Sequence, residues 1–234
     1  MTVPLVPGLA PLYPGDTEME VRRVQHRAHG DPANVSSLTC WLHCGTHVDA
    51  PVHFLDGQPG VDAVPIETLL GPAWVVDAAA EHGDIDAAAL SRRDIPDGAV
   101  RVLLRTSNSA LWKAPTFVEE SSRSLRTPPP RSPGGIRLVG IDYLSSASSR
   151  DRAPTHETFL RAGVTILETL DLRAVDPGWW DPTCLPLRIP GAEAPLRGPC
   201  SAVRDPVPRG PAATSGDSVR SPCAAPGWCP RRSA

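Results

Sequence analysis

Residues 43–53 read HCGTHVDAPVH and contain four side chains able to bind a metal: His43, His47, Asp49 and His53. Neutral imidazole and carboxylate groups are the usual protein ligands of Zn²⁺ and related divalent ions. Their density in this short segment indicates a metal site. With an open coordination position, such a site could activate water for hydrolysis.

All four residues stand at odd positions, which bears on how the segment presents them. Side chains of an extended segment alternate between two faces, so the four would share one face. A helix would bring only His43 and His47 together, and Gly45 and Pro51 disfavour a helix. The alternative is a solvated polar strand without a metal, which accounts for one such histidine better than for the whole set.

A catalytic metal usually takes further ligands from elsewhere in the chain. His156 opens a predicted helix, and Glu168 follows the apolar run VTIL, where the end of a strand often carries function in α/β folds. Each of the two, taken alone, could be an ordinary surface residue. His26, His29 and His82 lie in polar, loop-like segments and receive no role.

The elements that must position these residues are mostly short strands. Helices are predicted over 85–93, with Asp84 as N-cap, and over 156–163, closed by Gly163. Strands outnumber helices, which predicts an α/β domain with a curved or barrel-like mixed sheet and short flanking helices. The predicted strands cover residues 18–24, 37–43, 73–78, 100–106, 136–142, 164–170 and 183–189.

Composition narrows the functional classes. The net charge of −3 and a pI near 6.2 do not suggest a nucleic-acid or anionic-membrane partner. The N-terminal segment lacks the basic region of a signal peptide, and no apolar run approaches the roughly 18 residues that span a bilayer. We therefore expect a cytoplasmic protein, whose six cysteines do not form a disulfide framework.

Two stretches fit this organisation poorly. Prolines 128–130 forbid a helix within 124–135, where one would be natural before the next strand. Residues 199–234 are rich in Pro, Gly, Ser and Arg without apolar periodicity, which predicts a disordered tail behind a catalytic domain at 1–198. Shifted reading frames or local degeneration would explain both oddities, and resequencing the locus tests this hypothesis.

The segment HCGTHVDAPVHF resembles the HxGTHxDxPxHF signature of the metal-dependent cyclase family, which includes bacterial kynurenine formamidases. The resemblance covers about residues 4–198. It continues in order through YPGDT at 13–17, LLGPAWVVD at 69–77, VLLRT at 102–106, LVGIDYLS at 138–145, HETFLRAGVTILETLDL at 156–172 and CLPLRIPGAEAPLR at 184–197.

The resemblance implies a swivelling β/β/α fold, assembled as a homodimer or larger homo-oligomer, with a divalent metal site. It implies two Zn²⁺ ions, or Mn²⁺ as in some relatives. His53 falls on the position of the catalytic acid/base, and Tyr13 on that of a substrate-stacking tryptophan in the formamidases. The implied metal ligands are His43, His47, Asp49, His156 and Glu168, with Asp49 and Glu168 able to bridge two ions.

The predicted activity is hydrolysis of an amide, first of all in an N-formyl arylamine such as N-formylkynurenine of tryptophan catabolism. A first alternative is another activity of the same family, on a cyclic amide or ester or in a cyclisation. A second, of a different class, is an inactive relic that binds metal. A Ser-His-Asp hydrolase is disfavoured because the sequence has no GxSxG motif.

Overall fold

The structure is a computed structural model that describes residues 1–8, 11–79, 85–119, 135–147, 152–194 and 201–204. Its centre is a mixed sheet of seven strands in the order β3-β7-β6-β5-β4-β8-β9. The strands are β3 (His47–Asp49), β4 (Ala73–Asp77), β5 (Arg101–Arg105), β6 (Leu138–Ile141), β7 (Thr165–Glu168), β8 (Gly178–Thr183) and β9 (Ser201–Arg204).

Strands β4 to β7 are parallel, and β3, β8 and β9 run antiparallel to their neighbours at the two ends of the sheet. The parallel strands are continuous aliphatic runs because both of their faces are covered. One apolar cluster includes Val102, Val139 and Phe159, and the other includes Val75, Leu103 and Leu167. Neighbouring residues of one strand thus feed opposite faces of the sheet.

The helices are short, as predicted. They are α1 (Ile66–Leu69), α2 (Ala87–Ser91), α3 (Arg152–Arg161) and the 3-10 turns η1 (Arg27–His29), η2 (Pro51–His53), η3 (Val61–Ala63) and η4 (Ser107–Lys113). The predicted α/β class with a mixed sheet is confirmed. In the described parts of the chain, no helix has the length and apolar character to cross a bilayer.

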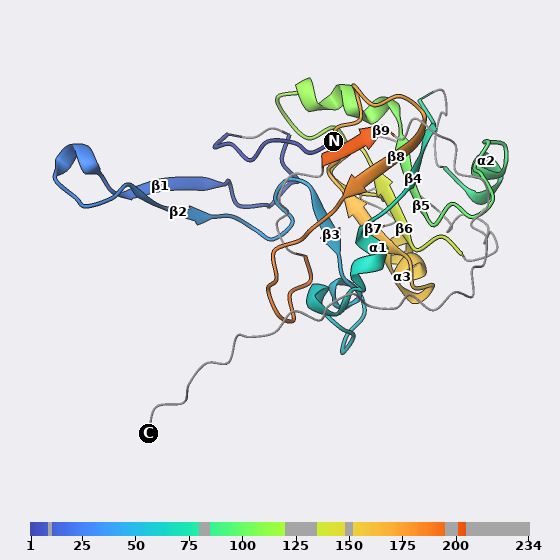
Figure 1. Cartoon of the computed structure of the whole chain (residues 1–234), viewed down its shortest axis with the longest axis horizontal. Helices are drawn as coiled ribbons and strands as arrows, with labels where there is room; N and C mark the ends of the chain where they lie inside the picture. The colour runs from blue at the N-terminus through green and yellow to red at the C-terminus, as the bar shows by residue number, and fades with distance from the viewer. Residues whose placement is uncertain (9–10, 80–84, 120–134, 148–151, 195–200, 205–234) are drawn as a thin grey trace, which may run out of the picture.

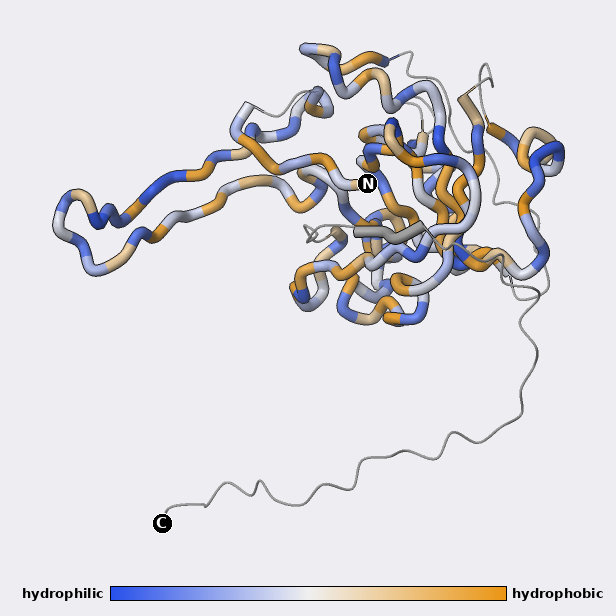
Figure 2. Tube along the Cα trace, turned by 45° about the horizontal axis from the view of Figure 1, so that its top comes forward, coloured by the Kyte–Doolittle hydropathy of each residue, from blue (hydrophilic) through white to orange (hydrophobic). Residues whose placement is uncertain are grey.

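A two-stranded hairpin stands apart from the sheet. It consists of β1 (Glu20–Gln25) and β2 (Val35–Thr39), paired antiparallel, and it projects from the body as a long arm (Figure 1). Every residue of both strands is exposed. Apolar residues are interspersed among polar ones along the arm (Figure 2), and Val21 lies opposite Leu38.

Several predicted boundaries are wrong. The strand expected over 37–43 ends at Thr39, and the one expected over 183–189 is instead β8, which ends at Thr183. Helix α3 begins at Arg152, four residues before His156, so His156 lies within the helix. The N-cap of α2 is Asp86, whose side chain accepts from the backbone N–H of Ala89, while Asp84 lies outside the described residues.

Part of the predicted disordered tail forms secondary structure. Residues Ser201–Arg204, within the segment predicted to be disordered, form β9 and pair with β8. A strand therefore follows the block at 184–197, and the prediction of disorder is wrong for these four residues. Most of the unusual stretch at 124–135, and the residues after 204, lie outside the described part of the chain.

Candidate metal centre

The segment at 43–53 is not one extended strand. His43 lies in a turn after the hairpin, His47 and Asp49 belong to β3, and His53 ends η2. The chain turns at Gly45, whose φ is +69°, and again at Pro51, which begins η2. The predicted period-two alignment is thus wrong, but the two turns bring the same side chains together.

Strand pairing and helix α3 add the distal residues. His47 lies directly opposite Glu168 in the antiparallel register of β3 and β7. The Nε2 atom of His156 lies 3.1 Å from Oε1 of Glu168 and 3.3 Å from Oδ2 of Asp49. The Nε2 atom of His47 lies 3.3 Å from Oδ1 of Asp49. The structure therefore brings all five predicted ligands to one place.

Hydrogen bonds at the far side of two imidazoles fix how they face this centre. The Nδ1 atom of His47 lies 2.8 Å from the carbonyl oxygen of Gly45, and that of His156 lies 2.7 Å from the carbonyl oxygen of Arg152. A carbonyl only accepts, so each Nδ1 carries the proton and each Nε2 presents a lone pair in the neutral ring. Backbone orientation of this kind is typical of metal-binding histidines.

The donor atoms fit a cation. Both carboxylate oxygens of Asp49 and the Nε2 atom of His43 are buried without a hydrogen-bond partner among the described residues. Buried unpaired polar atoms are costly, and lone pairs that face one another repel unless a cation or proton lies between them. Two groups of residues could each hold a metal ion: His43–Asp49–His53 and His47–Asp49–Glu168. Within each group, the ligand atoms lie within 4.8 Å of one another. Asp49 is common to both groups and could serve two adjacent ions.

The charges of the cluster perturb its pKa values. Burial lowers the pKa of His156, but the carboxylates of Asp49 and Glu168 outweigh burial and raise it to about 10. The pKa of His47 is raised in the same way, against its burial, by Asp49 and Glu168. Without a metal these imidazoles hold protons, which a metal ion would have to displace.

The pKa of His53 shifts in the opposite direction, downward. Burial lowers its pKa to about 4, although the Asp49 carboxylate raises it in part; the nearby imidazoles of His43 and His156 also lower it. Its ring centroid lies 4.1 Å from that of His43. With this lowered pKa, His53 is neutral at pH 7 and able to accept a proton. Its place beside His43 is equally compatible with a role as ligand.

Several residues that hold the cluster carry no signal in the sequence. The Thr46 hydroxyl donates to the carbonyl oxygen of Thr169 at 2.5 Å and accepts from the backbone N–H of Val3 at 3.2 Å. Thr169 follows Glu168 with a φ of +63°, a strained value for a β-branched residue. The backbone N–H of Ser146 donates to Oε1 of Glu168. These contacts join segments far apart in the chain.

The cluster opens into a cavity of about 270 Å³ with aromatic walls. Tyr13 lies in this cavity, as its predicted role requires, and packs on Phe117 with ring centroids 5.0 Å apart. Phe54 stacks on His156 at 4.4 Å. Trp41, Leu144 and Ser145 contribute to the wall, and the charged residues Asp16 and Arg152 also line the cavity.

Comparison with known proteins identifies the family of this chain. A family model described as "Putative cyclase" matches residues 1–147. The chain is 34% identical over 215 residues to a kynurenine formamidase from Erythrobacter litoralis, a match that covers 87% of this chain and 91% of that protein. The chain belongs to the cyclase family. Cyclase-like protein 2 of Oryza sativa is 37% identical over 192 residues, covering 76% of this chain and 68% of the relative.

Solved structures of the cyclase family share the fold. One is described as a potential metal-dependent hydrolase with cyclase activity; it is 28% identical, with a TM-score of 0.67, and the match covers 84% of this chain and 92% of that chain. Isatin hydrolase A from Labrenzia aggregata, at 21% identity, has a TM-score of 0.68 over 84% of this chain and 90% of its own, which speaks for the fold alone.

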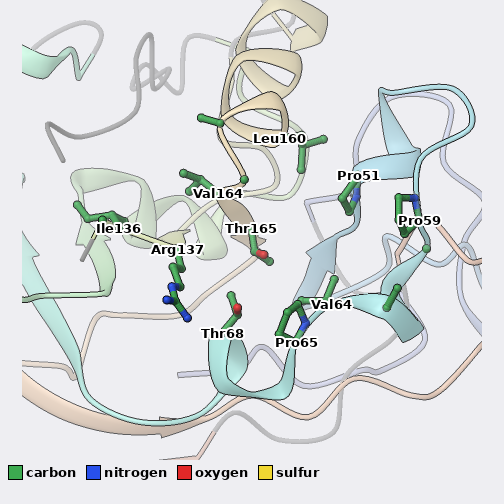
Figure 3. Close-up of a pocket in the computed structure, with 15 residues that line it drawn as sticks. Pro51, Pro59, Val64, Pro65, Thr68, Ile136, Arg137, Leu160, Val164 and Thr165 are labelled. Carbon is green, nitrogen blue, oxygen red and sulfur yellow. The ribbon is translucent and has the colours of Figure 1, made fainter. Parts of the chain in front are cut away.

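A second cavity, of about 480 Å³, lies away from the ligands of this cyclase-family chain. Figure 3 shows it between α1 with the Pro51–Pro65 loops on one side and the end of α3 with the start of β7 on the other. Its walls are largely proline and aliphatic side chains, with Arg137 as the charged group. None of the residues that line it is a candidate metal ligand.

Proposed function

We propose that this chain is a metal-dependent hydrolase that cleaves the amide bond of an N-formyl arylamine, with N-formylkynurenine as the first candidate substrate. The observation that carries the proposal is the sharing of the buried Asp49 between two ligand groups at the base of an aromatic cavity. The kynurenine formamidases among its relatives point to the formyl group.

The proposed ligands are His43, His47, Asp49, His156 and Glu168, around two divalent ions, with Zn²⁺ favoured by the nitrogen and carboxylate donors and Mn²⁺ as the alternative. When bound, such an ion lowers the pKa of a coordinated water from 15.7 to about 7 and polarises a carbonyl oxygen. Asp49 and Glu168 would hold the two ions together, and the backbone carbonyls of Gly45 and Arg152 keep His47 and His156 aimed at them.

The chain's own residues would move the proton. His53 is neutral at pH 7, so a ring nitrogen can take the proton from the attacking water and return it to the departing amine. Tyr13 and Phe54 would hold the aryl ring against the cavity wall, since offset aromatic contacts stabilise such a pair by about 0.5–1.5 kcal/mol. Leu144 and Trp41 narrow the cavity around the ring.

The test is a substrate panel offered to the protein loaded with Zn²⁺ or Mn²⁺: N-formylkynurenine, a lactam such as isatin, and an aryl lactone. The proposal expects the formamide to have the highest kcat/KM. A preference for the lactam or lactone would favour the alternative activity of the same family. Bound metal without turnover of any panel member would favour the inactive relic.

We also propose that the chain acts as a homodimer or larger homo-oligomer. The β1–β2 arm supports this proposal, because a two-stranded hairpin is marginally stable by itself and this one leaves Val21, Val24 and Leu38 exposed. Light scattering after size exclusion tests it on the full chain. A dimer that Leu38→Asp dissociates is expected, and a monomer at every concentration would contradict it.

The cytoplasm stays the proposed compartment. Among the described residues, Cys40 and Cys44 are free thiols. Free thiols are typical of a reducing compartment.

A further inference from the structure

Two charged side chains in the wall of the metal cavity have no part in the chemistry proposed above. They are Asp16 and Arg152, one acidic and one basic. Within the described part of the chain, neither forms an ion pair, with the other or with a third residue. Opposite charges that share a small cavity without pairing are available to a ligand.

Contacts hold both the backbone and the side chain of Arg152 in place. Its backbone carbonyl accepts from Nδ1 of His156, a proposed ligand, at 2.7 Å. Its guanidinium lies over the ring of Tyr13, with Cζ 4.9 Å from the ring centroid. A stacked guanidinium is held by cation–π attraction and keeps its N–H edge free. That edge is a planar fork that matches a carboxylate.

Asp16 follows Tyr13 by three residues, and its carboxylate interacts electrostatically with the imidazoles of His43 and His47 as well as with Arg152. Its backbone N–H donates to the carbonyl oxygen of Tyr13 at 3.0 Å, which closes the turn and holds the carboxylate near the ring. The residue is half-buried, and a partly desolvated carboxylate is stabilised by a cationic donor. A simple anion would bind Arg152 but be repelled by Asp16, whereas a group with both charges would satisfy the two.

We propose that Arg152 and Asp16 bind the carboxylate and the ammonium group of a substrate with an α-amino-acid side arm, and so select zwitterionic aryl formamides over neutral ones. The inference rests on the proposed formamidase function and deepens it by assigning the charged end of the substrate. The aryl ring then lies along Tyr13, with the formyl group toward the metal cluster. A cavity of about 270 Å³ suits one ring with a short arm.

The experiment compares three substrates on the full-length, metal-loaded protein: N-formyl-L-kynurenine, its analogue lacking the amino group, and neutral formanilide. Arg152→Gln should lower the ratio of kcat/KM for N-formyl-L-kynurenine to that for formanilide by about 10- to 100-fold, as expected for one charge-assisted pair. Asp16→Asn should lower the ratio of N-formyl-L-kynurenine to the deamino analogue. Arg161→Gln, on the same helix but paired with Glu157, is the control and should change neither ratio.

If Arg152→Gln lowers kcat/KM equally for all three substrates, Arg152 has a structural role through His156, and the inference is overturned. The inference is also overturned if the two variants leave the ratios of kcat/KM between substrates unchanged. If the wild type hydrolyses no formamide, the proposed function fails, and the inference is then tested by calorimetric binding of L-kynurenine. Binding weakened about tenfold or more by either variant, but not by Arg161→Gln, would uphold it. Equal binding by all variants, or none by the wild type, would overturn it.

Discussion

The Oδ2 atom of Asp49 lies 3.3 Å from the Nε2 atom of His156, and neither oxygen of this buried aspartate has a hydrogen-bond partner among the described residues. The contact joins β3 to helix α3, although strands β4, β5 and β6 lie between these two elements in the sequence. It brings together two groups that would repel if both presented lone pairs. A bound cation resolves that conflict, and the predictions below depend on it.

Replacing the shared carboxylate should remove the metal. Asp49→Asn keeps the shape of the side chain but loses its negative charge, so metal affinity should fall by at least about 100-fold, beyond the loss typical of outer-shell changes. Metal content after dialysis, measured by plasma emission, checks this. Asp77→Asn, at an exposed carboxylate that pairs with Arg105, is the control. Full metal content in Asp49→Asn would rule out the proposed centre.

Thr46→Val should weaken the centre without touching a ligand. It removes the hydroxyl that joins Val3 to Thr169, and the groups left unpaired should cost about 1–3 kcal/mol of unfolding free energy. Metal affinity should fall about 10- to 100-fold, as for other groups that orient ligands. Denaturant titration and metal competition measure the two effects. The exposed Thr39→Val is the matched control, and indistinguishable behaviour of the two variants would refute the role of Thr46.

His53→Ala should separate binding from catalysis. Loss of a general acid/base lowers kcat by about 100- to 10,000-fold, while the bound metal should stay near the wild-type amount. Turnover and metal content are measured on the same preparation, with the exposed arm residue His29→Ala as control. A parallel loss of metal would make His53 a ligand, in keeping with its place beside His43 and Asp49.

The protein stripped of metal should become less stable to heat as the pH rises above about 6.5. The folded pKa values of His47 and His156 are raised above the unfolded value of about 6.5, so their contribution is present below that pH and declines as pH rises, through about 10 for His156. His53 has the opposite effect below pH 6.5, because its folded pKa of about 4 favours the unfolded, protonated form.

Melting temperatures in the presence of a chelator, taken from pH 5 to pH 9, test this profile. They should change little between pH 5 and about 6.5, where Asp142, whose pKa burial raises to about 6, offsets His53, and should then fall. Added metal should flatten or reverse the fall, because ligand histidines bind metal only when deprotonated. A melting temperature of the chelated protein that rises steadily from pH 6.5 to pH 9 would contradict the charge arrangement described here.

The sequence predicts the sheet well because its strands are marked locally. The runs at 100–106 and 164–170 are aliphatic and bounded by polar or turn residues, and they became β5 and β7. Their boundaries shifted by one or two residues. The strand expected over 183–189 was misplaced because β8 holds Trp179, Trp180 and Pro182, a pattern with less apolar alternation than the segment after it.

The sequence predicts which residues come together at the candidate site but not the path of the backbone that brings them there. Period-two spacing suggested one strand across 43–53, whereas Gly45 and Pro51 turn the chain on either side of β3. His156 and Glu168 carry only a weak local signal, a predicted helix start and a strand end, so their assignment as ligands depends on the family resemblance. Thr46 and Arg152 act through contacts with residues distant in sequence or with a backbone carbonyl, which no local pattern encodes.

The most direct test of the account is a titration of the chelated protein with Zn²⁺, following bound metal and N-formylkynurenine hydrolysis together. The chelated protein should be inactive, and activity should appear with bound metal and stop rising near two ions per chain, with no recovery in Asp49→Asn. Full activity of the chelated protein, or recovery in Asp49→Asn equal to that of the wild type, would contradict the assignment of this cluster as a catalytic metal centre.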